Sequence, residues 1–196
     1  MAQLPKFSDL PVWSEARSKS CLGDELARLG GGTYGRVTLH RVKDAQNQKE
    51  ADDLQPGQLV ALKTFRAVSR KGDREKEIHI LDILQERPHP NLARALVAVF
   101  DPDAASWVGF VMPRLDMTLA QLMSATSGFI QDWKAAGIVD HLLAALSYLH
   151  DLGILHRDLK PDNVLLEMST QYSLLCRLAD FGWSRPSSSP CPTYFT

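Results

Sequence analysis

The chain has 196 residues, of which 44% are hydrophobic and 23% charged, so it is long enough for one good core or two small lobes of a soluble protein. With 22 basic and 23 acidic residues the net charge is -1, and no global positive field attracts nucleic acid or an anionic membrane. We therefore expect neither partner, and any bound phosphate must be held by a local site.

The cysteines and the N-terminus indicate the compartment. Cys21, Cys176 and Cys191 are an odd number without metal-ligand spacing, which favours reduced thiols. The first residues, MAQLPKFSDLPVWSE, lack the basic start and apolar run of a secretory signal. No apolar stretch approaches the roughly 20 residues that span a bilayer. The sequence therefore predicts an intracellular protein, cytoplasmic or nuclear.

The first part of the chain reads mainly as strands. Residues 1–20 are polar and irregular, and we expect a loose arm over 1–25. Apolar residues alternate on both sides of a glycine turn over 26–39, which predicts a hairpin. Residues 43–58 are polar and predict a long loop, and LVALKTF predicts a short strand over 59–65.

A helix and two more strands follow. In DREKEIHILDILQER, residues 73–87, apolar positions recur near helical spacing, and the prolines of RPHPNL stop the helix. Short apolar runs at 95–100 and 108–112 predict strands. From Thr118 to Leu152 the pattern is helical, with one apolar stripe formed by Ile138, Leu142, Leu143, Leu146 and Leu149.

The change of character along the chain predicts an α+β protein with two lobes. The first lobe, 26–112, has an antiparallel sheet with one helix. A hinge over 113–117 connects it to a helix-led second lobe over 118–196.

The glycine-rich stretch GGGTYGRV, residues 30–37, fits the pattern G-x-G-x-x-G-x-V. A dinucleotide-binding fold would need a helix to open at Gly35, but RVTLHRV alternates like a strand. Two interpretations remain: a hairpin whose backbone amides close over phosphates, and an ordinary hairpin turn.

Lys63 ends the apolar run VALK. Most lysines in such positions are surface residues. A functional interpretation needs a carboxylate that holds the ammonium beside a phosphate, and Glu77 in the next helix is available for this.

The strongest signal is HRDLKPDN, residues 156–163, followed by Asp180-Phe181-Gly182. Phosphoryl transfer needs a carboxylate near the substrate hydroxyl, oxygen ligands for magnesium, and cations that offset developing charge. This span supplies all of them. A mere polar surface turn does not explain the order of glycine loop, Lys, Glu, HRD and DFG.

The motifs GGGTYGRV, VALK, EIHIL, HPNL, HRDLKPDN and DFG together resemble those of the eukaryotic protein kinases, from about Leu26 to the end of the chain. The resemblance implies a kinase-like two-lobe fold, ATP and Mg²⁺ as cofactors, a protein substrate and a regulatory protein partner. Lys160, two residues after Asp158, is similar to the serine/threonine branch. GTYG and DFG-x-S-R are similar to the cyclin-dependent and mitogen-activated group.

The resemblance also implies roles for individual residues. Lys63 would bind the α- and β-phosphates and be fixed by Glu77, and Asp158 would accept the hydroxyl proton. Lys160 would lie against the γ-phosphate, and Asn163 and Asp180 would hold magnesium. The glycine loop and the adenine-binding set would comprise Leu29, Gly30, Gly32, Gly35, Val37, Ala61, Met112 as gatekeeper, Pro113, Leu115, Leu165 and Ala179. The apolar stack that couples the lobes in the family would comprise Leu81, Leu96, His156 and Phe181.

Pro113 departs from the family pattern, which usually has glutamate after the gatekeeper. Proline keeps its carbonyl, so the substitution is compatible with adenine binding through that carbonyl and the Leu115 amide.

The family continues to an A-P-E motif and a helical lobe that this sequence lacks. We therefore expect a fragment with an incomplete C-lobe that ends in the activation segment. The alternative to a kinase is a truncated, non-catalytic module that binds nucleotide or a partner. Thr196 is the first candidate for a regulatory phosphosite, with Thr193 and Tyr194 as alternatives, because TYFT is similar to phosphorylated loops of related kinases.

Overall fold

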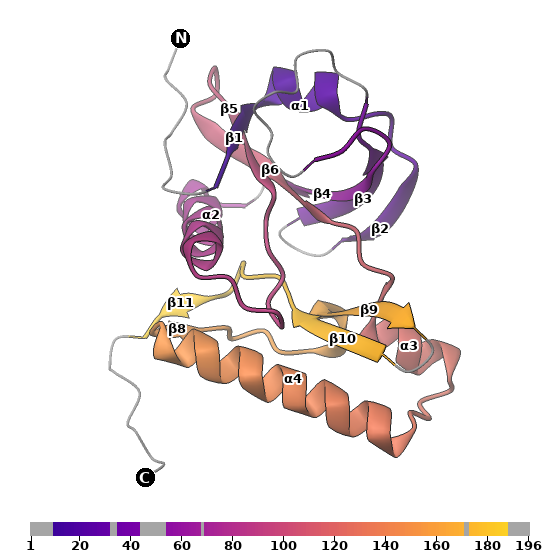
Figure 1. Cartoon of the computed structure of the whole chain (residues 1–196). Coiled ribbons are helices and arrows are strands. Elements are labelled where there is room, and N and C mark those ends of the chain that lie inside the picture. The colour runs from indigo at the N-terminus through magenta and orange to yellow at the C-terminus, as the bar shows by residue number, and fades with distance from the viewer. Residues whose placement is uncertain (1–9, 32–34, 44–53, 68, 171–172, 188–196) are drawn as a thin grey trace. The chain divides into compact units, whose positions relative to one another are not determined.

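The computed structural model describes residues 10–31, 35–43, 54–67, 69–170 and 173–187 (Figure 1). The chain forms two compact units. The first comprises residues 1–87 and 94–114, and the second comprises residues 88–93 and 115–196. Along the sequence, the change from the first to the second unit after Arg114 lies inside the expected hinge segment. The expected first lobe, 26–112, contained residues 88–93, whereas the structure places them with the second unit.

A six-stranded sheet forms the first unit, in the order β1-β5-β6-β4-β3-β2. Neighbouring strands are antiparallel, except for the parallel pair β1–β5. The bounds are β1 Val12–Ser14, β2 Ala27–Gly31, β3 Gly35–Arg41, β4 Leu59–Phe65, β5 Val97–Asp101 and β6 Ser106–Pro113. The alternation of apolar residues therefore predicted the hairpin β2–β3, and the short apolar runs predicted the strands β4, β5 and β6 to within a few residues.

Helix α2, Lys71–Glu86, belongs to the same unit. The negative charge of Asp73 in the first turn interacts favourably with the helix dipole, and the helix ends two residues before Pro88. Its buried residues are Glu77, Ile78, Ile80, Leu81, Asp82 and Leu84. Two of these carry carboxylates, and a buried charge needs partners.

The N-terminal segment is folded, so the prediction of a loose arm is wrong for residues 10–22. Strand β1 is followed directly by helix α1, Glu15–Cys21, whose N-terminus is capped by the Ser14 hydroxyl. Trp13 is 1% exposed and belongs to the core cluster of the unit. The prediction failed because a few widely spaced apolar residues give no periodicity, although Leu10, Trp13, Cys21 and Leu22 are buried. The members of the cluster are Trp13, Cys21, Leu22, Val42, Leu54, Val60, Leu96, Val97, Val99 and Val111.

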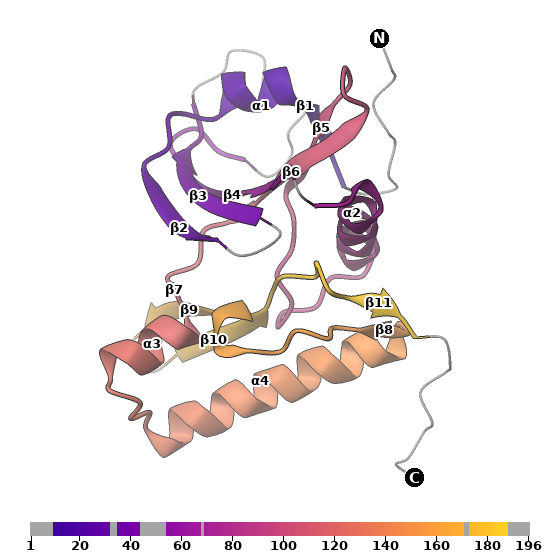
Figure 2. The same ribbon diagram turned by 180° about the vertical axis from the view of Figure 1, so that it is seen from behind.

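The second unit contains the helices α3, Leu119–Ala125, and α4, Asp132–Asp151 (Figure 2). The prediction of one helical segment over 118–152 is wrong at residues 126–131. Thr126 donates its backbone N–H to the carbonyl oxygen of Leu122, and the following Ser127 and Gly128 have φ values of 52° and 82°. A right-handed helix cannot continue through left-handed residues, so the chain turns there. None of the helices within the described ranges is long and apolar enough to cross a membrane.

Short strands complete the second unit: β7 Met117–Thr118, β8 Ile154–Leu155, β9 Val164–Thr170, β10 Ser173–Leu178 and β11 Arg185–Pro186. They form the sheets β10-β9-β7 and β11-β8, and the 3-10 helix η1, Pro161–Asn163, precedes β9. The core consists of Ile138 on α4 with Val164, Leu166 and Cys176. Burial raises the pKa of the Cys176 thiol to about 11, which makes it an unreactive core residue.

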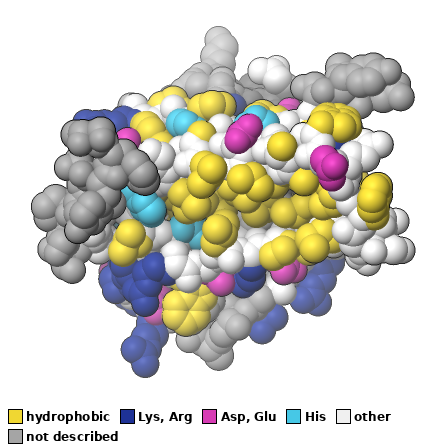
Figure 3. Space-filling view, turned by 90° about the horizontal axis from the view of Figure 1, so that it is seen from below, with side chains coloured by type: hydrophobic (Ala, Val, Ile, Leu, Met, Phe, Trp, Pro, Cys, Tyr) yellow, Lys and Arg dark blue, Asp and Glu magenta, His cyan; other side chains and the backbone are white. Residues whose placement is uncertain are grey.

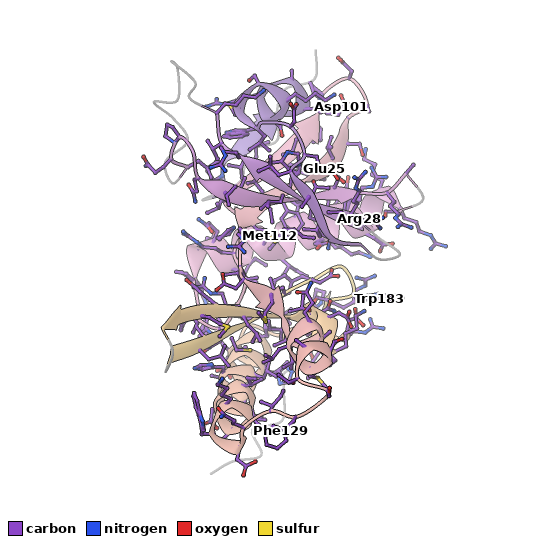
Figure 4. The ribbon with its side chains drawn as sticks, turned by 90° about the vertical axis from the view of Figure 1, so that its right-hand side faces the viewer. Glu25, Arg28, Asp101, Met112, Phe129 and Trp183 are labelled. Atoms are coloured by element: carbon purple, nitrogen blue, oxygen red, sulfur yellow. The ribbon has the colours of Figure 1, made fainter. Side chains whose placement is uncertain are left out.

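Helix α4 carries apolar residues on two sides. Ile138 and Leu149 of the predicted stripe are buried, and Leu142 and Leu146 are half-buried. Leu143 departs from the stripe because it is 60% exposed, and hydrophobic side chains gather on the face shown in Figure 3. In the connection between α3 and α4, Phe129 is 74% exposed (Figure 4).

Candidate active site

In the first unit, the central strand β4 and helix α2 bring two opposite charges together. The Nζ atom of Lys63 donates to Oε1 of Glu77 at 2.6 Å. The side chains are only 7% and 2% exposed. An isolated buried ion pair costs desolvation free energy that its attraction barely offsets, so stability alone explains it poorly. Such a pair is more typical of a functional site.

Strand pairing determines which side chains share the face of the sheet with Lys63. In antiparallel strands, directly paired residues point to the same face, as do residues two positions apart. Val37 on β3 pairs with Lys63, and Ala61 on β4 pairs with Met112 on β6. Val37, Ala61, Lys63 and Met112 therefore lie on one face, and Figure 4 shows Met112 near the end of the first unit's sheet.

The glycine-rich stretch is described on both sides of its turn. Gly35 is buried, and a Cβ atom there would lie 3.0 Å from the carbonyl oxygen of Thr64 and 3.1 Å from Cε of Lys63. Close packing against β4 therefore explains Gly35. At Gly30 a Cβ atom would meet nothing within 4 Å, so packing does not explain that glycine. Gly32 lies outside the described residues.

In the second unit, HRDLKPDN places two polar side chains beside the Asp158 carboxylate. Nζ of Lys160 donates to Oδ2 of Asp158 at 2.7 Å, and Nδ2 of Asn163 donates to the same oxygen at 2.9 Å. Asn163 also donates to the backbone carbonyl oxygen of Asp158 at 2.8 Å. The hydrogen bond that Lys160 donates to the Asp158 carboxylate raises the pKa of its ammonium. The carboxylate is therefore held in one orientation by two donors.

His156 connects this loop to the DFG stretch. Its Nδ1 accepts from the backbone N–H of Asp158 at 3.3 Å, and its ring packs edge-on against Phe181. The hydroxyl of Ser184 donates to the carbonyl oxygen of His156 at 3.2 Å, and both residues are buried. The backbone N–H of Ala179 donates to the carbonyl oxygen of Asn163 at 2.8 Å. The two motifs therefore form one hydrogen-bonded assembly.

Two residues of this assembly have left-handed backbones. Arg157 has φ 67° and Asp180 has φ 66°, although neither is glycine. Such conformations cost free energy and are concentrated at functional sites. The Asp180 carboxylate accepts from the backbone N–H of Gly182 at 3.3 Å, which closes the DFG turn.

Asn91 of HPNL was not assigned a role from sequence. It is 6% exposed, and its Nδ2 donates to the carbonyl oxygen of Cys176 at 3.0 Å. Its own carbonyl oxygen accepts from the N–H of Leu178, and Leu178 in turn accepts from the N–H of Ala93. Residues 88–93 are thus bound along the end of β10, immediately before Ala179 and Asp180. The motif HPNL was visible in the sequence, but its contact with β10 was not.

The expected site residues are divided between the two units. The first carries Leu29, Gly30, Gly35, Val37, Ala61, Lys63, Glu77, Met112 and Pro113. The second carries Leu115, Asp158, Lys160, Asn163, Leu165, Ala179 and Asp180. Besides Gly32, the expected phosphosites Thr193, Tyr194 and Thr196 lie outside the described residues.

Comparison with known proteins gives a consistent result. Residues 24–194 match the protein kinase domain family. Cyclin-dependent kinase 15 of Danio rerio is 32% identical over 169 residues, which cover 86% of this chain and 36% of the relative. A probable cell division protein kinase of Encephalitozoon cuniculi is 31% identical over 168 residues, covering 86% of this chain and 55% of the relative.

Cyclin-dependent kinase 14 of Oryctolagus cuniculus is 30% identical over 171 residues, covering 87% of this chain and 33% of the relative. The chain therefore spans about a third to just over a half of the length of these relatives. The family match contains both the buried Lys63–Glu77 pair and the assembly around Asp158. The chain belongs to the protein kinase family, with cyclin-dependent kinases among its relatives.

Proposed function

We propose that this chain contributes the nucleotide-binding and catalytic-loop residues of an ATP-dependent serine/threonine protein kinase, which transfers the γ-phosphoryl group of ATP to a protein hydroxyl. One observation carries the proposal. Lys160 and Asn163 both donate to Oδ2 of Asp158. This arrangement turns the other oxygen, Oδ1, to a substrate hydroxyl, whose proton it can accept as the oxygen attacks phosphorus.

Lys63 supports nucleotide binding in this proposal. Its ammonium is buried and held by Glu77, so little side-chain entropy is lost when a phosphate binds beside it. The face that carries Val37, Ala61 and Met112 is apolar and suits an adenine ring. The resemblance to the family assigns the carbonyl and amide partners of adenine to Pro113 and Leu115, and further apolar contacts to Leu29, Leu165 and Ala179.

The residues present also fit magnesium. Both hydrogen bonds of the Asn163 amide use its nitrogen, so the amide oxygen is the atom left for a cation. The Asp180 carboxylate would supply the second ligand. Mg²⁺ is typically bound by one or two protein oxygens together with substrate phosphates, and it neutralises the charge that develops on them. Among the described residues, no group of three or more His, Cys, Asp or Glu side chains is arranged to hold a metal ion.

Lys160 supports serine or threonine as the acceptor, because a lysine two residues after the HRD aspartate resembles the pattern of the serine/threonine kinases. A protein substrate and a regulatory protein partner are part of the proposal, and the names of the cyclin-dependent relatives support them. An intracellular location fits the buried free thiols of Cys21 and Cys176.

Phosphoryl transfer tests the proposal directly. The protein that carries this chain is incubated with γ-labelled ATP, Mg²⁺ and a panel of Ser/Thr and Tyr peptides. We expect label on serine or threonine and a loss of at least about 100-fold in Asp158→Asn, which keeps the shape but removes the base. Nucleotide binding with no Asp158-dependent transfer to any acceptor would instead support a non-catalytic, nucleotide-binding module.

A further inference from the structure

Residues 10–22, which we call the N-terminal strap, lie before the family match at residue 24 but are part of the first unit. Strand β1 extends the sheet beside β5, and the Ala98 N–H donates to the carbonyl oxygen of Pro11 at 2.8 Å. Trp13 anchors the strap in the core, and the Arg17 guanidinium lies 5.5 Å from the centre of its ring.

The strap also binds helix α2. The backbone N–H of Leu10 donates to Oδ1 of Asp82 at 3.2 Å. Leu10 is 2% exposed and Asp82 is 6% exposed, so water does not replace this bond easily. Figures 1 and 2 both show β1 running from α1 toward α2. A residue before the family match therefore reaches the helix that carries Glu77.

Asp82 and Glu77 are coupled by the helix that they share. They are five residues apart, or about 7.5 Å along the axis, within one uninterrupted helix. A helix of this length moves largely as a rigid element, so a bond that fixes Asp82 also limits the movement of Glu77. Glu77 in turn holds Lys63 at 2.6 Å.

We propose that the N-terminal strap, through the Leu10–Asp82 hydrogen bond, positions α2 so that Glu77 holds Lys63. Asp82 is then a positioning residue for the nucleotide-binding lysine, and this second part rests on the proposed function. The strap lies outside residues 24–194, which match the family.

The test measures the Lys63–Glu77 pair without requiring activity. A water-soluble amine-reactive ester labels Lys63 when the pair opens, and peptide mass spectrometry gives the rate, with Lys134 of the second unit as internal control. Asp82→Leu removes the acceptor, whereas Asp82→Asn keeps an oxygen in its place. We expect the Lys63 rate to rise about tenfold in Asp82→Leu and to stay within about twofold of wild type in Asp82→Asn.

A second pair of variants removes the donor instead. Leu10→Pro lacks the N–H, and Leu10→Ala keeps it while also losing the leucine side chain. We expect faster Lys63 labelling in Leu10→Pro than in Leu10→Ala. Low concentrations of urea separate local from global opening, because only global unfolding exposes enough surface to make the rate rise steeply with urea.

The outcomes distinguish this inference from the proposed function. Faster Lys63 labelling with a flat urea dependence, together with a several-fold weaker Kd for ATP–Mg²⁺, supports both parts. Unchanged Lys63 labelling in Asp82→Leu and Leu10→Pro overturns the proposal that the strap positions α2, whatever the affinity for nucleotide. Faster labelling with an unchanged Kd overturns the positioning role. If wild type binds no nucleotide, the proposed function fails, and Lys63 labelling still decides whether the strap holds α2.

Discussion

The Nε2 atom of His156 donates to the carbonyl oxygen of Ala179 at 3.0 Å. A carbonyl only accepts, so Nε2 carries the proton. The Asp158 N–H only donates, so Nδ1 on the other side of the ring must be unprotonated. Both bonds are satisfied by the neutral imidazole alone, and they bind the HRD loop to the residue before Asp180.

We therefore expect protonation of His156 to destabilise the protein. Burial lowers the pKa of His156 below its usual value of 6.5. The unfolded chain then binds the proton more readily, so the contribution to the free energy of unfolding is complete above pH 6.5. It is lost as the pH falls from 6.5 toward the lower pKa of the folded state. Urea unfolding at several pH values between 7.5 and 5 measures the slope of the free energy of unfolding against pH.

The matched control for this slope is His156→Gln, which does not titrate. His89 contributes to the same window, because burial also lowers its pKa. The difference in slope between wild type and His156→Gln isolates His156. Equal slopes in the two proteins would contradict the assignment of a buried neutral imidazole.

Replacing Lys63 should weaken nucleotide binding far more than replacing Lys76. Lys63→Met keeps an unbranched side chain of similar length but removes the cation and leaves Glu77 buried without the Lys63 ammonium. We expect the Kd for ATP–Mg²⁺, measured by calorimetric titration, to rise at least about tenfold. Lys76→Met is the control, because Lys76 is 53% exposed on the same helix as Glu77. Equal effects of the two substitutions would argue against the phosphate-binding role.

Asn91 should stabilise the segment that precedes the DFG turn. Asn91→Ala removes the donor to the Cys176 carbonyl and should lower the free energy of unfolding by about 1–3 kcal/mol. Asn91→Asp should be more damaging at pH 7, because it places a carboxylate oxygen against a carbonyl oxygen in a buried position. Urea unfolding of the three proteins gives the order, and an Asn91→Asp protein as stable as wild type would contradict it.

Much of the fold could be predicted because its elements have clear periodicity. LVALKTF became β4 over the predicted residues, and the prolines after α2 end that helix as expected. The strap escaped prediction because β1 has only three residues and depends on β5, which lies about 85 positions later. The break between α3 and α4 was missed because apolar residues continue across it, although Ser127 and Gly128, both with positive φ, form a dipeptide that favours a turn.

The candidate site also has features that the sequence could predict and features that it could not. The motifs place candidate site residues at fixed spacing, so the sequence proposed Lys63, Glu77, Asp158 and Asn163. The structure places the first two and the last two in contact. Contacts made through backbone groups give no sequence motif that could predict them. Asp82 accepts from an N–H and Asn91 donates to a carbonyl, and any residue at Leu10 or Cys176 offers those groups.

The two sides of α4 should respond very differently to the same truncation. Leu149 is fully buried, and Leu149→Ala should lower the free energy of unfolding by about 2–5 kcal/mol through lost burial and the remaining cavity. Leu143 is 60% exposed, and Leu143→Ala should change it by no more than about 0.5 kcal/mol. Urea unfolding at low protein concentration measures both. Because Leu143 and the 53% exposed Val139 present apolar surface to water, the double variant Val139→Ser/Leu143→Ser should also bind less of an apolar dye while remaining folded. A loss of stability at Leu143 as large as at Leu149 would mean that this side of α4 is covered in solution.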